Sequence, residues 1–326
     1  MKQEDVAKAL GLSKTTVSRA LSGKGRVGKA TRDRVNEYME TVNREERMKL
    51  SFGPTKNLCV VIPGDRYISG NTYFSECLYG ICESASTMDY NVFVIKGTEN
   101  DISEIVKVVE ERKADGIILT RSLENDRALS FLCGIDYPVG VAGHTDFENA
   151  ISVDIDNKAA ANELTSLLIS KGFKNFALVV DDLNFKVNKS RYEGMSDAIK
   201  QWDTNKEKQF IYTGRFTPEL LERLSDNIIN DKTECIICGD DEITVKIMSG
   251  LTNEGFRIPR DVAVASCANS PTLNALTPTV TAVDVPARMV GAELGKQMIC
   301  CLEGRPYNRE TLLDYEILIR KSTNRV

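Results

Sequence analysis

Residues 5–21 read DVAKALGLSKTTVSRAL, and the spacing of three of them decides how this part of the chain can fold. Ala7 is small enough for two helices to approach each other, Gly11 allows a sharp turn, and the β-branched Val17 can lock the second helix in a shared core. The spacing therefore predicts two short helices on either side of Gly11, the second of them capped by Ser13.

A third helix completes this N-terminal part. A glycine-rich loop leads to a helical pattern from about residue 29 to residue 42. Apolar residues of the three helices can form one small core: Val6, Ala7, Leu10, Val17, Ala20, Leu21, Val27, Val35 and Met39. We therefore expect residues 1–42 to form a helix-turn-helix head, with an ordinary three-helix bundle as the alternative.

The exposed face of the second helix carries hydrogen-bonding side chains suited to the major groove of DNA: Lys14, Thr15, Ser18 and Arg19. Other residues are suited to holding phosphates, which position a protein on DNA without reading its sequence: Thr16, Lys24, Arg26 and Arg32. Residues 1–56 contain 13 Lys and Arg against 7 Asp and Glu, a net charge of +6, whereas the rest of the chain has a net charge of −11. A basic head on an acidic body indicates a polyanionic partner for the head alone.

The remainder of the chain divides into a linker and a large α/β region. Residues 43–56 are highly charged and end at Gly53-Pro54, which is typical of a linker. Over residues 57–326, amphipathic helical stretches alternate with β-rich runs at 58–62, 91–95, 116–119, 139–142, 176–180, 210–212, 235–238 and 262–265. Such alternation predicts parallel sheets with helices on both faces. About ten strands over this length suit two doubly wound lobes, with a ligand cleft between them at the carboxyl ends of the strands.

Composition argues against several classes of protein. No apolar run approaches the roughly 20 residues of a membrane span, and the first residues lack a secretory signal, so we expect a cytoplasmic protein that does not bind membranes. Nine scattered cysteines are typical of reduced thiols. Cys235 and Cys238 lie three apart in a predicted strand and point to opposite faces, which disfavours a metal clip. His144 is the only histidine, so the chain lacks the histidines that a histidine-based zinc site requires, and a Ser-His-Asp triad could use only this residue. We therefore expect neither metal nor cofactor.

One motif favours an enzyme. Residues 23–30, GKGRVGKA, approach the pattern of a phosphate-binding loop. Such a loop follows a strand, whereas this run follows a predicted helix, and Ala30 lacks the hydroxyl that binds magnesium. We therefore do not expect the protein to be an enzyme.

Residues 5–21, followed by Val27 and TRDRV at 31–35, strongly resemble the head of LacI/GalR-family transcriptional regulators. Further matches to the family occur in the expected order at residues 71–74, 80–81, 115–119, 156–157, 191–194, 240–241, 258–264 and 318–323. The resemblance implies two lobes of the type I periplasmic-binding-protein-like fold. It also implies a homodimer on a pseudo-palindromic operator, whose DNA affinity, in the manner of a repressor, responds to an effector bound between the lobes.

The linker departs from the family. Its relatives fold this segment into a hinge helix on DNA, and a leucine of that helix wedges into the minor groove, a position that Leu50 occupies here. Arg47 replaces the small residue at which two hinge helices would pack, adding bulk and like charge. The alternative function is therefore a ligand-binding protein of the same fold that has lost tight, specific DNA binding.

The resemblance also places effector-binding residues in the cleft. Arg191 is implied as the main polar anchor with Asp241 opposite, and a guanidinium and a carboxylate suit the hydroxyls of a sugar or polyol. Three aromatic residues are candidates to cover a sugar ring or, alternatively, to pack in the core: Tyr73, Phe74 and Phe216. Gly143 and Ala268 occupy positions where family members often carry aspartate, and His144 and Asn269 are the candidates to replace those acceptors.

Overall fold

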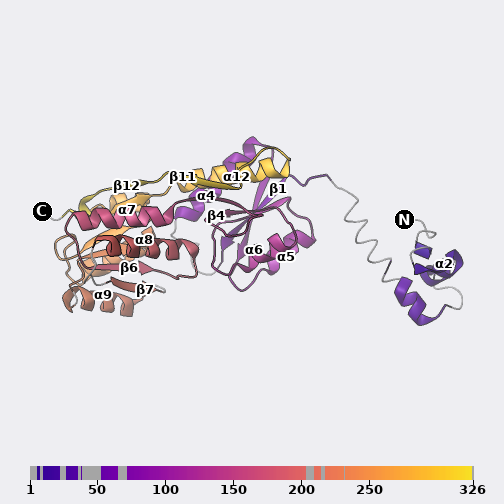
Figure 1. The fold of residues 1–326 in the computed structure, drawn as a ribbon, viewed down its shortest axis with the longest axis horizontal. Coiled ribbons are helices and arrows are strands. Elements are labelled where there is room, and N and C mark those ends of the chain that lie inside the picture. Colours follow the sequence, from indigo (N-terminus) through magenta and orange to yellow (C-terminus); the bar gives the residue numbers. More distant parts are fainter. Residues whose placement is uncertain are drawn as a thin grey trace. The chain divides into compact units, whose positions relative to one another are not determined.

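The computed structural model describes residues 6–7, 10–22, 27–35, 38, 53–64, 72–202, 209–213, 217–230 and 232–324. The chain divides into two compact units, Met1–Thr55 and Lys56–Val326 (Figure 1). The predicted boundary between head and linker, at residues 42 and 43, falls within residues 39–52, which lie outside the described residues, so it stays a prediction. Met39 of the predicted core lies in the same range. Within the described residues, no helix combines the length and the apolar character that crossing a membrane requires.

The N-terminal unit contains the predicted turn. Gly11 has a φ of +66°, in the left-handed region that glycine adopts without strain. The Ser13 hydroxyl accepts a hydrogen bond from the Thr16 amide at 3.1 Å and so caps α2, which runs from Lys14 to Ser22. A small core holds the unit together: Val6, Ala7, Val17, Ala20 and Val35. The predicted helix-turn-helix head is confirmed, because β-branched residues from the successive segments meet in one core.

The first lobe is built on a six-stranded parallel sheet in the order β11-β5-β4-β3-β1-β2. Its strands are β1 (Asn57–Pro63), β2 (Asn91–Gly97), β3 (Gly116–Leu119), β4 (Val139–Ala142), β5 (Ile151–Ile155) and β11 (Glu310–Leu313). One apolar cluster joins a face of the sheet to α4 (Thr72–Thr87) and α12 (Ala287–Leu302), and another joins the opposite face to α5 (Ser103–Glu110) and α6 (Arg127–Gly134). Since both faces are covered, a strand such as β3 is buried at every residue.

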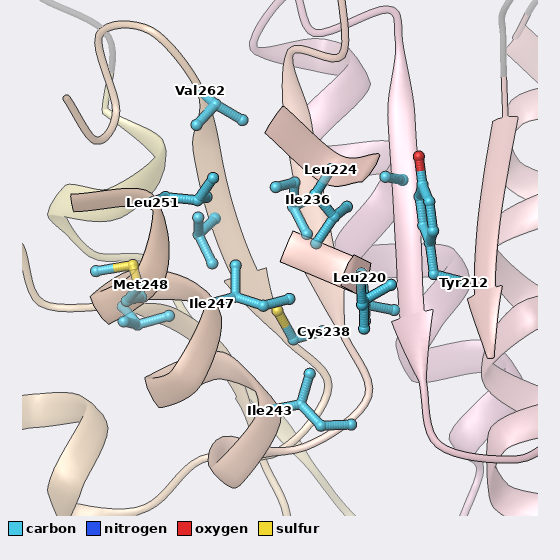
Figure 2. Close-up of a cluster of buried hydrophobic side chains, with 14 of the residues drawn as sticks. Tyr212, Leu220, Leu224, Ile236, Cys238, Ile243, Ile247, Met248, Leu251 and Val262 are labelled. Carbon is cyan, nitrogen blue, oxygen red and sulfur yellow. The ribbon is translucent and has the colours of Figure 1, made fainter. Parts of the chain in front are cut away.

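The second lobe repeats this plan in the order β12-β10-β9-β8-β6-β7, with only the β10–β12 pair antiparallel. Its strands are β6 (Phe176–Val180), β7 (Gln209–Thr213), β8 (Cys235–Cys238), β9 (Ala263–Ser266), β10 (Thr281–Asp284) and β12 (Glu316–Leu318). Helices α7 (Asn157–Ser170) and α8 (Lys186–Trp202) cover one face, and α9 (Pro218–Asn230) and α10 (Asp241–Asn253) cover the other. Figure 2 shows the second of these cores, where Ile247 and Leu251 of α10 face Ile236 of β8. The short helix α11 (Pro271–Ala275) and a closing turn, η1 (Lys321–Thr323), complete the lobe.

The chain passes between the lobes three times, after β5, after β10 and after β11. The two doubly wound lobes predicted from the alternation are therefore confirmed, but β5, β10, β11 and β12 were not expected. These four strands lie toward one edge of their sheets. The strands β11 and β12 are half exposed, so these two lack the continuous apolar run by which buried strands are recognised.

Glycines bring one helix pair in each lobe into backbone contact. A Cβ atom on Gly80 of α4 would lie 2.0 Å from the carbonyl oxygen of Arg288 in α12. In the second lobe, a Cβ atom on Gly194 of α8 would lie 2.1 Å from the carbonyl oxygen of Lys158 in α7. Figure 1 shows the two pairs, α4 with α12 and α7 with α8. The contacts fix the positions of α4 and α8, whose first turns reach the cavity described below.

Candidate functional site

A cavity of about 110 Å³ lies between the two lobes of the larger unit. Each water molecule needs roughly 10–15 Å³ of such space, so the cavity has room for a ligand of about monosaccharide size. Its lining residues follow the carboxyl ends of strands or begin helices, as in other open α/β sheets. They are Tyr73, Phe74, Thr120, Arg121, Ser122, Ala142, Gly143, His144, Asp154, Asn157, Phe185, Lys186, Val187, Asn188, Ser190, Arg191, Asp240, Ala268 and Val285.

Arg191 is the buried cation of the cavity. Its side chain comes from the second turn of α8 and is only 8% exposed. Nη1 donates a hydrogen bond to the Gly239 carbonyl oxygen at 2.5 Å, which orients the guanidinium, while Nε has no hydrogen-bond partner among the described residues. A buried donor without a partner carries a free-energy cost that a ligand oxygen would relieve.

Two carboxyl groups approach the cavity, one from each lobe. Asp154, the penultimate residue of β5, accepts hydrogen bonds from the His144 amide at 3.1 Å and from Asn157 Nδ2 at 3.0 Å. Asp240 caps α10 by accepting a hydrogen bond from the Ile243 amide at 2.8 Å. Burial raises the pKa of each carboxyl to about 6, and the charge of Arg191 acts in the opposite direction on both. The site therefore holds acceptors for hydroxyl groups next to a fixed donor.

Aromatic rings supply the apolar part of the lining. Tyr73 and Phe74, in the first turn of α4, meet edge to face with ring centroids 5.6 Å apart. Burial raises the pKa of Tyr73 well above its ordinary value, so this residue keeps its phenolic proton. On the opposite wall, Phe185 lies under Arg121, whose guanidinium carbon is 5.4 Å from the ring centroid.

The structure brings four of the predicted effector residues to this cavity: Tyr73, Phe74, His144 and Arg191. Asp241 does not line it: its carboxylate is buried and accepts a hydrogen bond from Thr72 Oγ1 at 3.3 Å, whereas the preceding Asp240 does line it. Asn269 is likewise outside the lining, held between Asp284 at 2.8 Å and Arg320 at 2.9 Å. Phe216 lies outside the described residues.

Sequence reasoning missed several lining residues. Asp154 and Asn157 were missed because β5 was not recognised, so its carboxyl end was not searched. Asp240 has the sequence signature of a helix cap, a short acceptor placed three residues before the amide that it binds, and this signal would have separated it from Asp241. Gly143 has a φ of +135°, a conformation that side chains rarely adopt, which gives a physical reason for glycine at this departure from the family.

The predicted DNA-reading face lies on α2. Lys14, Thr15 and Arg19 are exposed, and Ser18 is half-buried. Thr16 is also half-buried, and its hydroxyl lies 2.8 Å from that of Ser13. Arg32 is half-buried, and its Nε is without a hydrogen-bond partner among the described residues. The other predicted DNA contacts lie outside the described residues: Lys24, Arg26 and Leu50. The unusual hinge residue, Arg47, also lies outside them.

Two family models match the chain. The description of the first is "Bacterial regulatory proteins, lacI family", and it matches residues 3–43. The description of the second is "Periplasmic binding protein-like domain", and it matches residues 165–323.

Relatives match over most of the chain. Catabolite control protein A of Staphylococcus xylosus is 28% identical over 295 residues, which are 88% of this chain and 88% of the relative. The crystal structure of the transcription regulator CcpA of Lactococcus lactis superposes with a TM-score of 0.72 at 26% identity, covering 82% of this chain and 99% of that one. The structure of the transcriptional regulator CelR in complex with cellobiose covers 99% of both chains with a TM-score of 0.74 and, at 20% identity, shows the shared fold alone.

The order of these matches agrees with the structure. The lacI-family match spans the helix-turn-helix unit, and the periplasmic-binding-protein-like match spans the second lobe with the returning segments of the first. Six-stranded, mostly parallel sheets in two lobes are the type I form of the latter fold. The chain therefore belongs to the LacI family of bacterial regulatory proteins, with a lacI-family DNA-binding domain followed by a periplasmic-binding-protein-like ligand-binding domain.

Proposed function

We propose that this protein is a cytoplasmic transcriptional repressor whose affinity for operator DNA is set by a sugar or related polyol bound in the cavity between the lobes. One observation carries the ligand assignment: the buried Arg191, whose Nε has no hydrogen-bond partner among the described residues, lines the same cavity as Asp154 and Asp240. Vicinal hydroxyl groups can accept from the guanidinium and donate to the carboxylates at the same time.

The rest of the lining supports a sugar. Asn157 and Asn188 are both buried and carry amides that can donate and accept, and Tyr73 and Phe74 offer faces for the C–H groups of a sugar ring. The structural neighbour CelR is in complex with cellobiose, which places a sugar on the same fold. The small volume of the cavity favours a ligand of about one sugar unit.

The head supports binding to operator DNA. Lys14, Thr15 and Arg19 present donors and a methyl group on the exposed face of one helix, the chemistry that reads base edges in the major groove. One such head contacts few base pairs, so we propose that two copies of the chain bind a pseudo-palindromic operator as a homodimer. A ligand alters this affinity only if it binds one arrangement of the lobes better than another.

The ligand assignment is tested by thermal unfolding of the full-length protein with cellobiose, maltose, glucose, ribose and adenosine. A bound ligand raises the melting temperature by mass action. We expect at least one sugar to do so for the wild type and not for Arg191→Gln, while Lys200→Gln, an exposed change on the same helix, keeps the response. Stabilisation by adenosine alone, or an unchanged response of Arg191→Gln, would contradict the assignment.

DNA binding is tested by a mobility shift on the DNA upstream of the protein's own gene, with and without competitor DNA. We expect a specific complex that the stabilising sugar strengthens or weakens and that Arg19→Ala weakens, because a base-edge contact contributes about 1–3 kcal/mol of discrimination. Binding that competitor DNA abolishes entirely, together with a normal response to sugar, would favour the alternative of a ligand-binding protein without a specific operator.

A further inference from the structure

The covalent connections between the lobes lie along one edge of the two sheets. The three crossings leave β5, β10 and β11, each of which is an edge strand or the neighbour of an edge strand. In the first sheet β3 lies two strands beyond β5, and in the second sheet β6 lies three strands beyond β10. The loops that follow β3 and β6 are thus remote from the crossings, on the side where the lobes have no covalent link among the described residues.

The loop after β3 meets the end of the loop after β6 and the first turn of α8 in what we call the interlobe clamp, defined as residues 121–124 of the first lobe and 184–189 of the second. Leu123 and Phe185 form an antiparallel β-bridge. The Glu124 amide donates to the Asn184 carbonyl oxygen at 2.9 Å, and the Lys186 amide donates to the Ser122 carbonyl oxygen at 3.2 Å. Two strand-like hydrogen bonds therefore join lobes that share no sheet.

Side chains reinforce the interlobe clamp. Lys189 Nζ lies 2.8 Å from Glu124 Oε2, and this hydrogen bond is the main cause of the raised pKa of Lys189. Asn184 Nδ2 donates to Glu99 Oε2 at 3.1 Å. Lys186 forms an ion pair with Asp146 of the first lobe. Hydrogen bonds from Thr72 to Asp241 at 3.3 Å and from Asn157 to Asp154 at 3.0 Å also join the lobes, outside the clamp.

We propose that the interlobe clamp sets the separation of the two cavity walls, with Glu124 and Lys189 as positioning residues that do not line the cavity. Arg121, Ser122, Phe185 and Lys186 belong both to the clamp and to the cavity lining, so a change in the clamp moves both walls. The Glu124–Lys189 pair acts on the lining through the backbone of these neighbours. The effect on an effector rests on the proposed function, whereas the clamp itself does not.

The deciding experiment is hydrogen–deuterium exchange, resolved to single amides, on the full-length protein with no sugar added. The reporters are the amides of Glu124 and Lys186, which bond across the lobes, and the amide of Leu178 in β6 serves as the internal reference. In the wild type we expect both reporters to exchange far more slowly than an unstructured peptide. Exchange at the unstructured rate at both reporters would overturn the proposal.

Charge reversal then separates positioning from general stability. We expect Glu124→Lys to speed exchange at Lys186, and Lys189→Glu to speed it at Glu124, by about three- to tenfold, because each reversal replaces an attraction with a repulsion. The double variant restores the pair with reversed sign and should return both rates to within about twofold of the wild type, with Leu178 unchanged throughout. Failure of the double variant to restore protection would overturn the role of the pair.

A backbone variant tests the bridge directly. Lys186 is the first residue of α8, where proline is tolerated, so Lys186→Pro removes the interlobe N–H without breaking the helix. Lys186→Ala is the matched control, which loses the same side chain and keeps the N–H. We expect exchange at Glu124 to be faster in the proline variant than in the alanine variant, and equal rates would overturn the bridge. If the reporters are protected but no sugar raises the melting temperature, the proposed ligand is contradicted and the clamp is not. If a sugar raises the melting temperature but the reporters are unprotected, the clamp is contradicted and the proposed ligand is not.

Discussion

The two lobes of the larger unit share a plan and differ in what they bring to the cavity. Both have six strands, in orders that correspond strand by strand, and both have one helix pair in backbone contact through glycine. Each also places one half-buried carboxyl group at the cavity, Asp154 in the first lobe and Asp240 in the second. The buried guanidinium of Arg191 belongs to the second lobe, while Tyr73 and Phe74 belong to the first.

The difference shows which parts of such a fold can diverge. A buried parallel sheet needs only apolar residues that fit between two helix layers, so two lobes of different sequence can keep one topology. The side chains that follow the carboxyl ends of the strands are free of this demand, and they carry the chemistry of the site. The second lobe supplies the buried cation, the first supplies Tyr73 and Phe74, and the cavity lining combines both.

The largest expected effect tests whether the helix pairs of the two lobes are equivalent. Gly80→Ala and Gly194→Ala each place a methyl group about 2 Å from a backbone oxygen, so a helix must shift. We expect each to lower the free energy of unfolding by about 1–3 kcal/mol, the range for overpacking, with near-equal values in the two lobes. Thermal and urea unfolding measure this. Gly134→Ala, at the end of α6 with open space around it, is the control and should not destabilise the protein. A large loss in the free energy of unfolding from only one of the two glycine variants would show that the helix pairs of the two lobes are not equivalent.

A smaller effect is expected from the two carboxyl groups, through pH. The pKa of Asp154 and that of Asp240 are raised to about 6, above the roughly 3.9 of an unfolded chain, so between these values the folded protein holds protons that the unfolded chain releases. The stabilisation that comes from holding these two protons in the folded state is therefore fully present below about pH 4 and is lost as the pH rises through about 6. Asp240→Asn retains a residue that can cap α10 and should stabilise the protein by about 1–2 kcal/mol at pH 7.5 and not at pH 4.

Asp154→Asn is the matching test in the first lobe, read from melting temperatures over the same pH series. A similar gain would show that burial acts alike on the two sides of the cavity. A gain at Asp240 alone would show that the hydrogen bonds of Asp154 to His144 and Asn157 need its negative charge.

The smallest effect is expected from the ion pairs across the two helix pairs. Arg288 makes two hydrogen bonds to Glu83 between α12 and α4, and Lys158 lies 2.9 Å from Asp197 between α7 and α8. About half of each side chain is exposed, so solvent screens both pairs. We expect Arg288→Gln and Lys158→Gln to lower the melting temperature only slightly at low salt and not at all at high salt. A fall as large as that of the glycine variants would show that these pairs, not the close backbone contacts, hold the helices.

Much of the fold could be predicted because local rules agree with the tertiary structure there. The turn at Gly11, the cap at Ser13 and the buried runs of β1, β3 and β8 are all encoded within a few residues, by backbone freedom, by a side-chain acceptor or by a continuous apolar stretch. The edge strands β11 and β12 were missed because half-exposed strands of three or four residues have no pattern that separates them from loops. Their pairing depends on partners more than 30 residues away in the chain.

The sequence by itself determined the class of protein, because residue types and short spacings specify it, and the same signals predicted a reading face on α2 and a binding role for Arg191. Only the tertiary structure decided which of two adjacent aspartates lines the cavity, since Asp240 and Asp241 begin one helix and leave it in different directions. It alone also revealed the interlobe clamp, whose bonded residues Glu124 and Lys189 are 65 positions apart. A contact of that kind joins segments that belong to two different sheets and lie far apart in the chain, and no local pattern encodes it.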